Sequence, residues 1–375
     1  KLLKEVQEQA PCVLALQEVD HYEDIASDLR SFGYEGMYLM RDGETSDGCA
    51  TFWKTSQFRL RCHHKVLFSE FGLRNNVALL LALEPIDESL RMKSQYGRRH
   101  LVVCNTHILF NPKRGDIKLA QVRMLMEQLA EFSGRTEQMM TSDSTDRSSS
   151  EAPAASLPPE RGAEAASSEG DGEQAKAAVV IAGDFNAIPH SGIYHFMAEG
   201  RLDCLSLDRR RMGSEAYHPR AQSPVAEYHG PYSNAHLRFT GSQSHTKLSN
   251  KKKKLNLAWE QEHLQHAVGK AAANRGDYTA CHPYSFRSAY MHAAGAEPAF
   301  TTYHESAHAT VDYIWHTPQL TARRVLMTPS LQQLPHWCKG LLSPEWPSDH
   351  MSLVCDFVMG AAKPITASKL LENSH

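Results

Sequence analysis

The sequence lacks the features that mark a disulfide-rich, zinc-binding or membrane-spanning protein. Its eight cysteines are spread singly through 375 residues without a CxxC pair, which argues against a disulfide framework. We therefore expect reduced thiols in an intracellular protein of the cytoplasm, the nucleus or both. No signal peptide is recognisable, and no uninterrupted apolar run approaches the roughly 20 residues needed to cross a bilayer, so we expect no membrane partner.

Large apolar residues are scarce in two stretches. Residues 133–177 contain nine serines and carry nine acidic against four basic side chains, which predicts a disordered acidic insertion. Residues 209–276 carry twelve basic against four acidic side chains, which predicts a basic insertion able to meet an anionic polymer. Its six histidines have no regular ligand spacing, so we expect no zinc site there. The run Lys251–Lys254 is too common to decide between nucleus and cytoplasm.

The rest of the chain alternates short apolar runs with helical patterns. Helices are predicted at 1–10, 21–29, 117–132 with Asp116 at its N-cap, and 193–198. Strands are predicted at 12–16, 49–53, 77–83, 101–107, 179–182, 310–315 and 351–357. This order favours one α/β domain over residues 1–358, which both insertions interrupt without dividing, followed by a tail over 359–375.

The chain is organised around Val179-Val180-Ile181-Ala182-Gly183-Asp184-Phe185-Asn186. Four apolar residues predict a buried strand, and Gly183 opens a turn at its carboxyl end. Asp184 and Asn186 are two residues apart, so on an extended backbone they project to the same side. A carboxylate and a carboxamide at one point can handle a water molecule and a phosphate. Taken alone, the motif fits an ordinary strand-to-loop turn equally well.

Other apolar runs also end in polar groups. Glu18 follows the strand at 12–16 and offers hard oxygen ligands to a metal, although a surface glutamate capping the next helix is the alternative. Asn105 and His107 share one face of another strand. Asn105 is a candidate for substrate binding, and the histidine either contacts phosphate or satisfies a loop carbonyl. Asp312 lies in an apolar strand, where a carboxylate is costly unless paired, and His350 is its natural partner. A purely structural Asp–His pair is the alternative.

Three further residues are candidates for contact with substrate. Arg74 and Asn76 stand before a buried strand, where they suit phosphate or base contacts about as well as turn chemistry. Lys118 lies near the start of the helix at 117–132, facing either the site or water.

The ordered motifs LALQEVD, DGCATFW, NTHILFNPKRGDIKLAQ, IAGDFNAIP, TVDYIW and PSDH resemble the exonuclease–endonuclease–phosphatase superfamily. Within it they are most similar to the branch of carbon-catabolite-repressor-type deadenylases, nocturnin and Angel. The resemblance covers residues 1–132, 178–208 and 284–358. It implies a DNase-like α/β fold, a four-layer sandwich of two packed mixed β-sheets flanked by helices.

The resemblance also implies roles for single residues. It makes Glu18 a ligand of Mg²⁺, with Mn²⁺ as the alternative, and places Asp349 beside the metal. It makes Asp184 the base, Asn186 and His107 phosphate contacts, and Asp312 the partner of His350. The family begins with a strand whose asparagine helps to bind metal. Since no such strand precedes Lys1, we expect this sequence to be a fragment that is poorly active until the strand is restored.

The implied function is a magnesium-dependent phosphodiesterase acting on RNA 3′ ends. We expect a 3′-to-5′ exoribonuclease of the poly(A)-specific deadenylase type in mRNA turnover, with an RNA 2′,3′-cyclic phosphatase of the Angel type or a small-molecule phosphatase as alternatives. A non-enzymatic RNA-binding adaptor is a further alternative. Pro112 matches a proline that poly(A)-specific members place against adenine, but Ala307 stands where those members have an aromatic residue, which argues against poly(A) preference.

Overall fold

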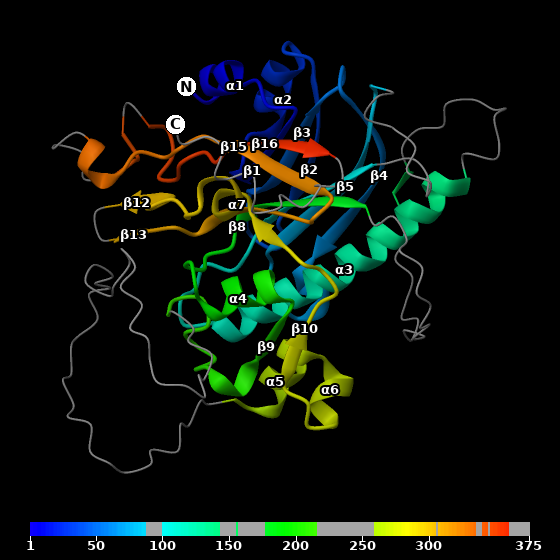
Figure 1. Ribbon diagram of the computed structural model, residues 1–375, viewed down its shortest axis with the longest axis vertical. Coiled ribbons are helices and arrows are strands. Elements are labelled where there is room, and N and C mark those ends of the chain that lie inside the picture. The colour runs from blue at the N-terminus through cyan, green and yellow to red at the C-terminus, as the bar shows by residue number, and fades with distance from the viewer. Residues whose placement is uncertain are drawn as a thin grey trace, which may run out of the picture.

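Two β-sheets packed face to face form the centre of the molecule, with helices on both outer sides (Figure 1). The computed structural model describes residues 1–87, 100–142, 155–156, 177–215, 259–304, 307–334, 340–343 and 346–359.

The larger sheet has seven strands in the order β11-β14-β8-β6-β5-β4-β7. Their bounds are β11 Arg287–Ser288, β14 Asp312–His316, β8 Ala178–Asp184, β6 Leu101–His107, β5 Val77–Pro85, β4 Phe58–Leu67 and β7 Ala155–Ser156. The sheet is mixed, because β6 pairs parallel with β8 and β4 with β7, whereas the other pairs are antiparallel. β5 is buried along its whole length, which explains its almost continuous run of leucine, valine and alanine.

The smaller sheet has the order β1-β3-β2, from β1 Val13–Val19, β3 Gly48–Lys54 and β2 Tyr34–Met40. All its pairs are antiparallel, so the expectation of two mixed sheets is wrong for this one. The seven residues between β2 and β3 let the chain turn straight back, whereas parallel neighbours need a long crossover. Side chains of both sheets form one apolar core between them, which also includes Leu320 and Phe357 of the hairpin β15 (Leu320–Val325) and β16 (Cys355–Met359).

Helices cover both outer faces, which confirms the four-layer α/β fold. α1 (Leu2–Gln9) and α2 (Tyr22–Arg30) pack on the smaller sheet around Val6, Leu29 and Phe52. α3 (Gly115–Ser142), α4 (Gly192–Glu199) and α5 (Gln261–Val268) share the second apolar cluster with the outer face of the larger sheet. The remaining elements are short: α6 Lys270–Asn274, α7 Ala289–Ala294, β9 Arg201–Asp203, β10 Thr279–Cys281, β12 Thr302–His304, β13 Ala307–Ala309, and 3₁₀ turns at Phe68–Phe71, Cys204–Ser206 and Leu331–Gln333.

The acidic insertion begins later than its composition predicts. Residues 133–142 continue α3, and Ala177 is a buried residue next to β8. The last turns of α3 are fixed by His100, whose ring is 2.9 Å from the hydroxyl of Thr136, and by Glu137, which accepts a hydrogen bond from the amide of Ala177. These long-range contacts are invisible to composition. The predicted disorder at 143–154 and 157–176 lies outside the described residues.

The basic insertion is also shorter than predicted, because both of its ends are folded. Met212 is fully buried, and the backbone carbonyls of Met212 and Gly213 accept hydrogen bonds from Ile193 and Ile188. At the other end, α5 and α6 occupy residues predicted to be irregular, with Leu264, Ala267 and Val268 buried. A low average hydrophobicity therefore concealed a short amphipathic helix. Residues 216–258, with the run Lys251–Lys254, lie outside the described residues.

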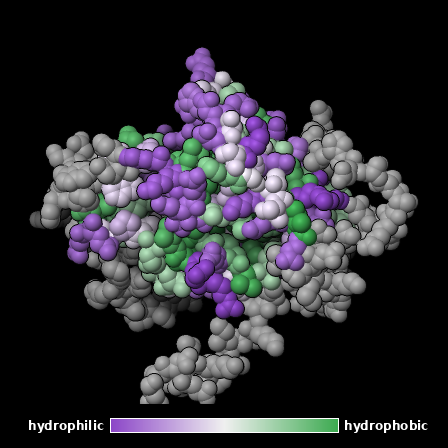
Figure 2. All heavy atoms as spheres, turned by 90° about the horizontal axis from the view of Figure 1, so that it is seen from above, coloured by the Kyte–Doolittle hydropathy of each residue, from purple (hydrophilic) through white to green (hydrophobic). Residues whose placement is uncertain are grey.

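Two smaller predictions need correction. Asp116 lies inside the first turn of α3, since the helix begins at Gly115. The last strand begins at Cys355, and Met351–Val354 are irregular, because the chain there places His350 beside Asp312 before it joins β15. Among the described residues, no helix is long and apolar enough to cross a membrane. The face shown in Figure 2 mixes hydrophilic and hydrophobic residues, and neither kind covers it.

Candidate active site

Three neighbouring strands bring predicted site residues to one level of the larger sheet. His107 of β6 is the parallel partner of Asp184 of β8, and Asp184 is in turn the antiparallel partner of Asp312 of β14. Partners in adjacent strands lie close together, so the register alone collects a histidine and two carboxylates. The prediction that polar groups at these strand ends converge is confirmed for these three residues.

The backbone around Asp184 is shaped by a glycine and by a left-handed turn. A Cβ on Gly183 would lie 2.0 Å from the carbonyl oxygen of Thr106, so only glycine allows β8 to approach β6 here. Gly183 is therefore part of the strand and does not open a turn. Asn186 has φ 48° and lies beyond the strand, which corrects the expected extended geometry. It is this turn that brings the asparagine amide back to Asp184.

Asp184, Asn186 and His107 form one hydrogen-bonded group. The backbone amide of Asn186 donates to Asp184 Oδ1 at 2.6 Å, and its side-chain amide donates to Asp184 Oδ2 at 3.1 Å. The same Nδ2 lies 3.2 Å from His107 Nε2 and 3.0 Å from the carbonyl oxygen of Ile108. Burial, reinforced by the negative charge of Asp312, raises the pKa of Asp184 well above its usual range. A carboxylate in this position is a stronger base than one in water.

His107 is neutral at physiological pH and nearly inaccessible. Burial, with the positive charge of Arg41, lowers the pKa of His107 to about 4. Its Nε2 faces an amide donor, so we infer that the ring proton is on Nδ1, which lies 3.9 Å from Glu18 Oε1. Through Nε2, His107 orients the side-chain amide of Asn186, and its contact with phosphate stays a prediction.

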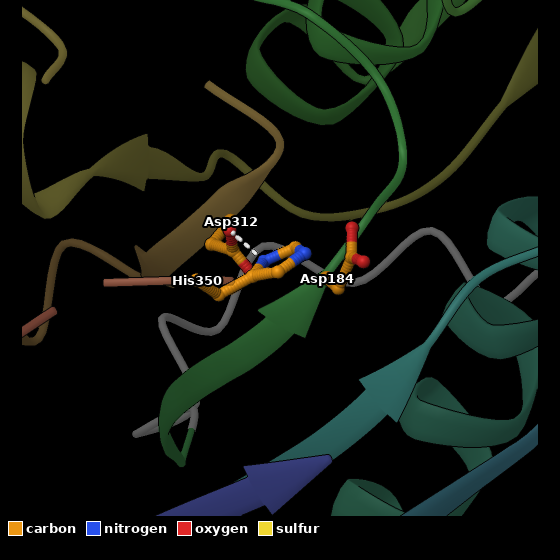
Figure 3. Close-up of side chains that lie close together, drawn as sticks. All are labelled: Asp184, Asp312 and His350. Carbon is orange, nitrogen blue, oxygen red and sulfur yellow. Dashed lines mark hydrogen bonds and ion pairs between the residues drawn. The ribbon is translucent and has the colours of Figure 1, made fainter. Parts of the chain in front are cut away.

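His350 is held by Asp312 and faces Asp184. His350 Nδ1 lies 2.8 Å from Asp312 Oδ2, and Figure 3 shows the ring between the two carboxylates, with its second nitrogen toward Asp184. Burial alone would lower the pKa of His350, but the hydrogen bond and charge of Asp312, followed by Asp184 and Asp349, outweigh it and raise this pKa to about 9. His350 is thus a cation at neutral pH, and the predicted pairing with Asp312 is confirmed.

A distorted strand end presents Glu18 to the same site. The pairing of β1 with β3 is irregular between Leu16 and Val19, and Glu18 has φ 54°. Its side chain is 69% exposed, and α2 shows no side-chain cap, so the alternative of a capping glutamate is not observed. Asp349, adjacent to His350, is half-buried, and its carbonyl oxygen accepts hydrogen bonds from Tyr303 and Thr302.

These residues suit a hard divalent cation, which prefers oxygen ligands. A metal could be held by the accessible carboxylate of Glu18 together with Asp349. Ligand atoms of Asp184, Asp312 and His350 also lie within 4.8 Å of one another. However, a protonated imidazole has no lone pair for a metal, and Nδ1 of His350 already serves Asp312. Glu18 and Asp349 therefore stay the predicted metal ligands.

Lys118 supports, from inside the protein, the loop after β8 that carries Asn186. Its Nζ lies 2.5 Å from the carbonyl oxygen of Asn186, and the side chain is almost fully buried. Burial lowers the pKa of Lys118 to about 8, against the opposing charge of Asp184. Of the two predicted orientations, Lys118 takes the one toward the site, where it fixes the left-handed turn.

Asn105, predicted to bind substrate, is instead buried between the sheets. Its Oδ1 accepts a hydrogen bond from Gln17 at 2.7 Å, and its Nδ2 donates to the carbonyl oxygens of Leu16 and Ala50. It therefore joins β6 to β1 and β3 behind the site. Asn76 is also buried, and its amide donates to the carbonyl oxygen of His107 at 3.0 Å. Both asparagines position the site without facing a substrate.

Replacing Asn105 with alanine should destabilise the fold by about 2–4 kcal/mol, since several buried partners would lose their hydrogen bonds together. The free energy of unfolding is measured by urea titration. Asn111→Ala, in an exposed loop, is the matched control. Equal stabilities of the two variants would contradict the role of Asn105 in joining the sheets.

Arg74 and Pro112 lie on loops and are exposed, and their contact with substrate stays a prediction. Ala307 belongs to β13, and its side chain is outside the described residues. Sequence reasoning missed Arg41, whose charge acts on His107 and whose guanidinium pairs with Asp47. It also missed Gln17, which holds Asn105. The only signal was the position of Gln17 beside Glu18.

Comparisons with known proteins agree with this geometry. Residues 1–350 match the model of the endonuclease/exonuclease/phosphatase family. "Carbon catabolite repressor protein 4 homolog 5" of Arabidopsis thaliana is 36% identical over 95% of this chain and 68% of its own length. "Protein angel homolog 2" of Danio rerio is 28% identical over 85% of this chain and 48% of its own.

A solved structure extends the comparison to three dimensions. The crystal structure of ANGEL2, described as a 2′,3′-cyclic phosphatase in complex with adenosine-2′,3′-vanadate, superposes with a TM-score of 0.62. It is 27% identical and covers 95% of this chain and 84% of its own. The shared fold, the family model and the assembled Asp184, Asn186 and His350 agree. The chain belongs to the endonuclease/exonuclease/phosphatase family of hydrolases.

Proposed function

We propose that this protein is a divalent-metal-dependent phosphodiesterase that acts on RNA 3′ ends inside the cell. One observation supports this proposal most directly. The buried carboxylate of Asp184 lies opposite the cation of His350, and the side-chain amide of Asn186 lies beside Asp184. A base, a cation and a neutral donor around one point are what attack of water on a phosphate ester requires.

In the proposed reaction, Asp184 orients a water molecule and accepts its proton. The imidazolium of His350 stabilises the negative charge that develops on the phosphoryl oxygens, and Asp312 keeps that ring charged and oriented. The side-chain amide of Asn186, next to His107 Nε2, fixes the carboxylate of Asp184, and Lys118 holds the backbone carbonyl of Asn186. A bound Mg²⁺ or Mn²⁺, for which Glu18 and Asp349 are the ligands, would polarise the phosphate and the leaving oxygen.

Two reactions at an RNA 3′ end fit this chemistry. The first is the 3′-to-5′ exoribonuclease of the deadenylase type that the sequence leads us to expect, with Pro112 exposed as an adenine contact would need to be. The second is hydrolysis of a 2′,3′-cyclic phosphate. Two observations favour it: Ala307 offers no ring for stacking on adenine, and ANGEL2 is described as such a phosphatase. Since this chain spans only part of the length of its relatives, both are proposals.

The two reactions are separated by a paired substrate test. The protein is incubated with Mg²⁺ and a 5′-labelled RNA that ends in a run of adenosines, beside a matched RNA that ends in a 2′,3′-cyclic phosphate. A ladder that shortens from the 3′ end and favours the adenosine run would establish the deadenylase. Loss of the cyclic phosphate alone, on an RNA of unchanged length, would establish the phosphatase.

The control is His350→Ala, which removes the cation. If neither RNA changes, and the unmodified protein and His350→Ala behave alike, the proposed function is wrong.

A further inference from the structure

A basic pocket lies where the loop from β6 joins the start of α3. It has a volume of about 420 Å³ and is walled by the loop before β5, the start of α3, and α5. Cationic or titratable groups come from all three walls: Arg74, Arg114, His263 and His266. Glu262 is the one acidic residue among those that line it.

The charge of this pocket is only partly neutralised. Asp116, buried beneath it, binds Arg114 through two hydrogen bonds of 3.0 and 3.1 Å and is also 3.3 Å from Arg209. His263 Nε2 also lies 3.7 Å from Asp116. Three arginines, Arg74, Arg114 and Arg209, thus stand against two carboxylates, Asp116 and Glu262. Arg74 is exposed and has no hydrogen bond or ion pair within the part of the chain that the structure describes. Its guanidinium is available to a ligand, and a planar fork of donors suits phosphate.

The pocket and the loop that carries Asn186 both lie against the first turn of α3. Ile117 lines the pocket, whereas the next residue, Lys118, reaches the carbonyl oxygen of Asn186. Successive residues of a helix point about 100° apart, so the pocket and Asn186 lie against neighbouring faces of the first turn of α3. On the surface, the loop from Ile108 to Lys113 connects His107 to Arg114. It carries Phe110, which is 72% exposed and offers a ring on which a base can stack.

We propose that this pocket binds a backbone phosphate of single-stranded RNA upstream of the 3′ end that reacts at Asp184. The assignment of RNA rests on the proposed function. The argument for an anion rests on Arg74 and Arg114 alone. An RNA strand that leaves the catalytic residues along the loop from Ile108 to Lys113 passes Phe110 and then reaches these arginines. Arginines bind backbone phosphate whatever the base.

The test measures binding separately from turnover. RNA labelled at its 5′ end is titrated by fluorescence anisotropy, with Mg²⁺ present, in an Asp184→Asn background that should not hydrolyse it. Arg74→Glu and His266→Glu change opposite walls of the pocket, and Arg30→Glu, an exposed arginine at the end of α2, is the matched control for net charge. Arg114 is left intact because of its bond to buried Asp116.

Arg74→Glu should bind a long single-stranded RNA roughly tenfold more weakly than the control, the effect of one lost charge-assisted hydrogen bond. His266→Glu should also weaken binding, because it adds a negative charge to the pocket. The slope of log affinity against log salt should fall by about 0.7 for each lost phosphate contact. A mononucleotide, which fills only the catalytic residues, should bind all variants equally.

Unchanged RNA affinity and salt slope in both pocket variants would overturn the proposal. A matching loss for the mononucleotide would overturn the upstream position, because the substitutions would then act on the catalytic site itself. If the unmodified protein hydrolyses neither RNA of the paired substrate test but Arg74→Glu still weakens RNA binding, the proposed reaction fails while the pocket stands.

Discussion

Replacing Asp184 with asparagine should lower kcat on the preferred RNA by about 10²–10⁴-fold, the range typical for loss of a general base. Asparagine keeps the size of the side chain and a carbonyl oxygen that can accept the 2.6 Å hydrogen bond from the Asn186 amide. It cannot accept a proton from water. The measurement is single-turnover hydrolysis with Mg²⁺ in excess, so that chemistry is observed without product release.

The stability of Asp184→Asn separates a catalytic from a structural role. Burial and the charge of Asp312 both disfavour the carboxylate, so removal of the charge should leave the melting temperature unchanged or higher. The control is Asp24→Asn, whose side chain on α2 is 86% exposed and which should change neither activity nor stability. A loss of activity that merely follows a loss of folded protein would contradict the assignment of Asp184 as the base.

Much of this site can be predicted from the sequence, since its residues follow apolar runs at strand ends. Asp184 after Val179–Ala182 and His107 at the end of 101–107 converge because neighbouring strands share a register. The pairing of Asp312 with His350 follows from a different argument, the cost of an unpaired carboxylate in an apolar strand. Both arguments depend on local pattern and elementary energetics, and both lead to the observed contacts.

The direction in which a side chain faces is less predictable. Asn105 and His107 share a strand face, yet Asn105 turns out to be enclosed by Gln17, Leu16 and Ala50. Which residues of that face reach the site depends on how the smaller sheet packs against it. The sequence of one strand does not show this packing. The left-handed turn at Asn186 is equally hard to predict, because Lys118, which is distant in sequence, stabilises it.

The boundaries that composition predicts are wrong for both insertions. Residues 133–142 and 259–276 are polar on average, but a few buried side chains and long-range hydrogen bonds order them. The consequence bears on function, since α5 supplies one wall of the basic pocket. Part of the segment expected to be a basic insertion is therefore folded against α3.

Replacing His350 with alanine should lower kcat by about 10²–10³-fold, as for loss of one donor to a charged transition state. Asp312→Asn should have a smaller effect, because the ring remains but loses the negative charge that keeps it protonated. The double variant should be scarcely worse than His350→Ala alone, since Asp312 acts through the ring. Additive losses would show that Asp312 acts independently.

The pH profile distinguishes this catalytic pair from a purely structural one. The pKa of His350 is raised to about 9, so the cation is present at neutral pH and is lost as the pH rises through that value. We expect kcat/KM of the unmodified protein to fall above about pH 9. In Asp312→Asn that fall should move to lower pH, because the hydrogen bond and the charge that raise the pKa are gone. A structural pair would change the melting temperature but leave the alkaline limb where it is, so an unmoved limb in an active Asp312→Asn protein would remove His350 from the reaction.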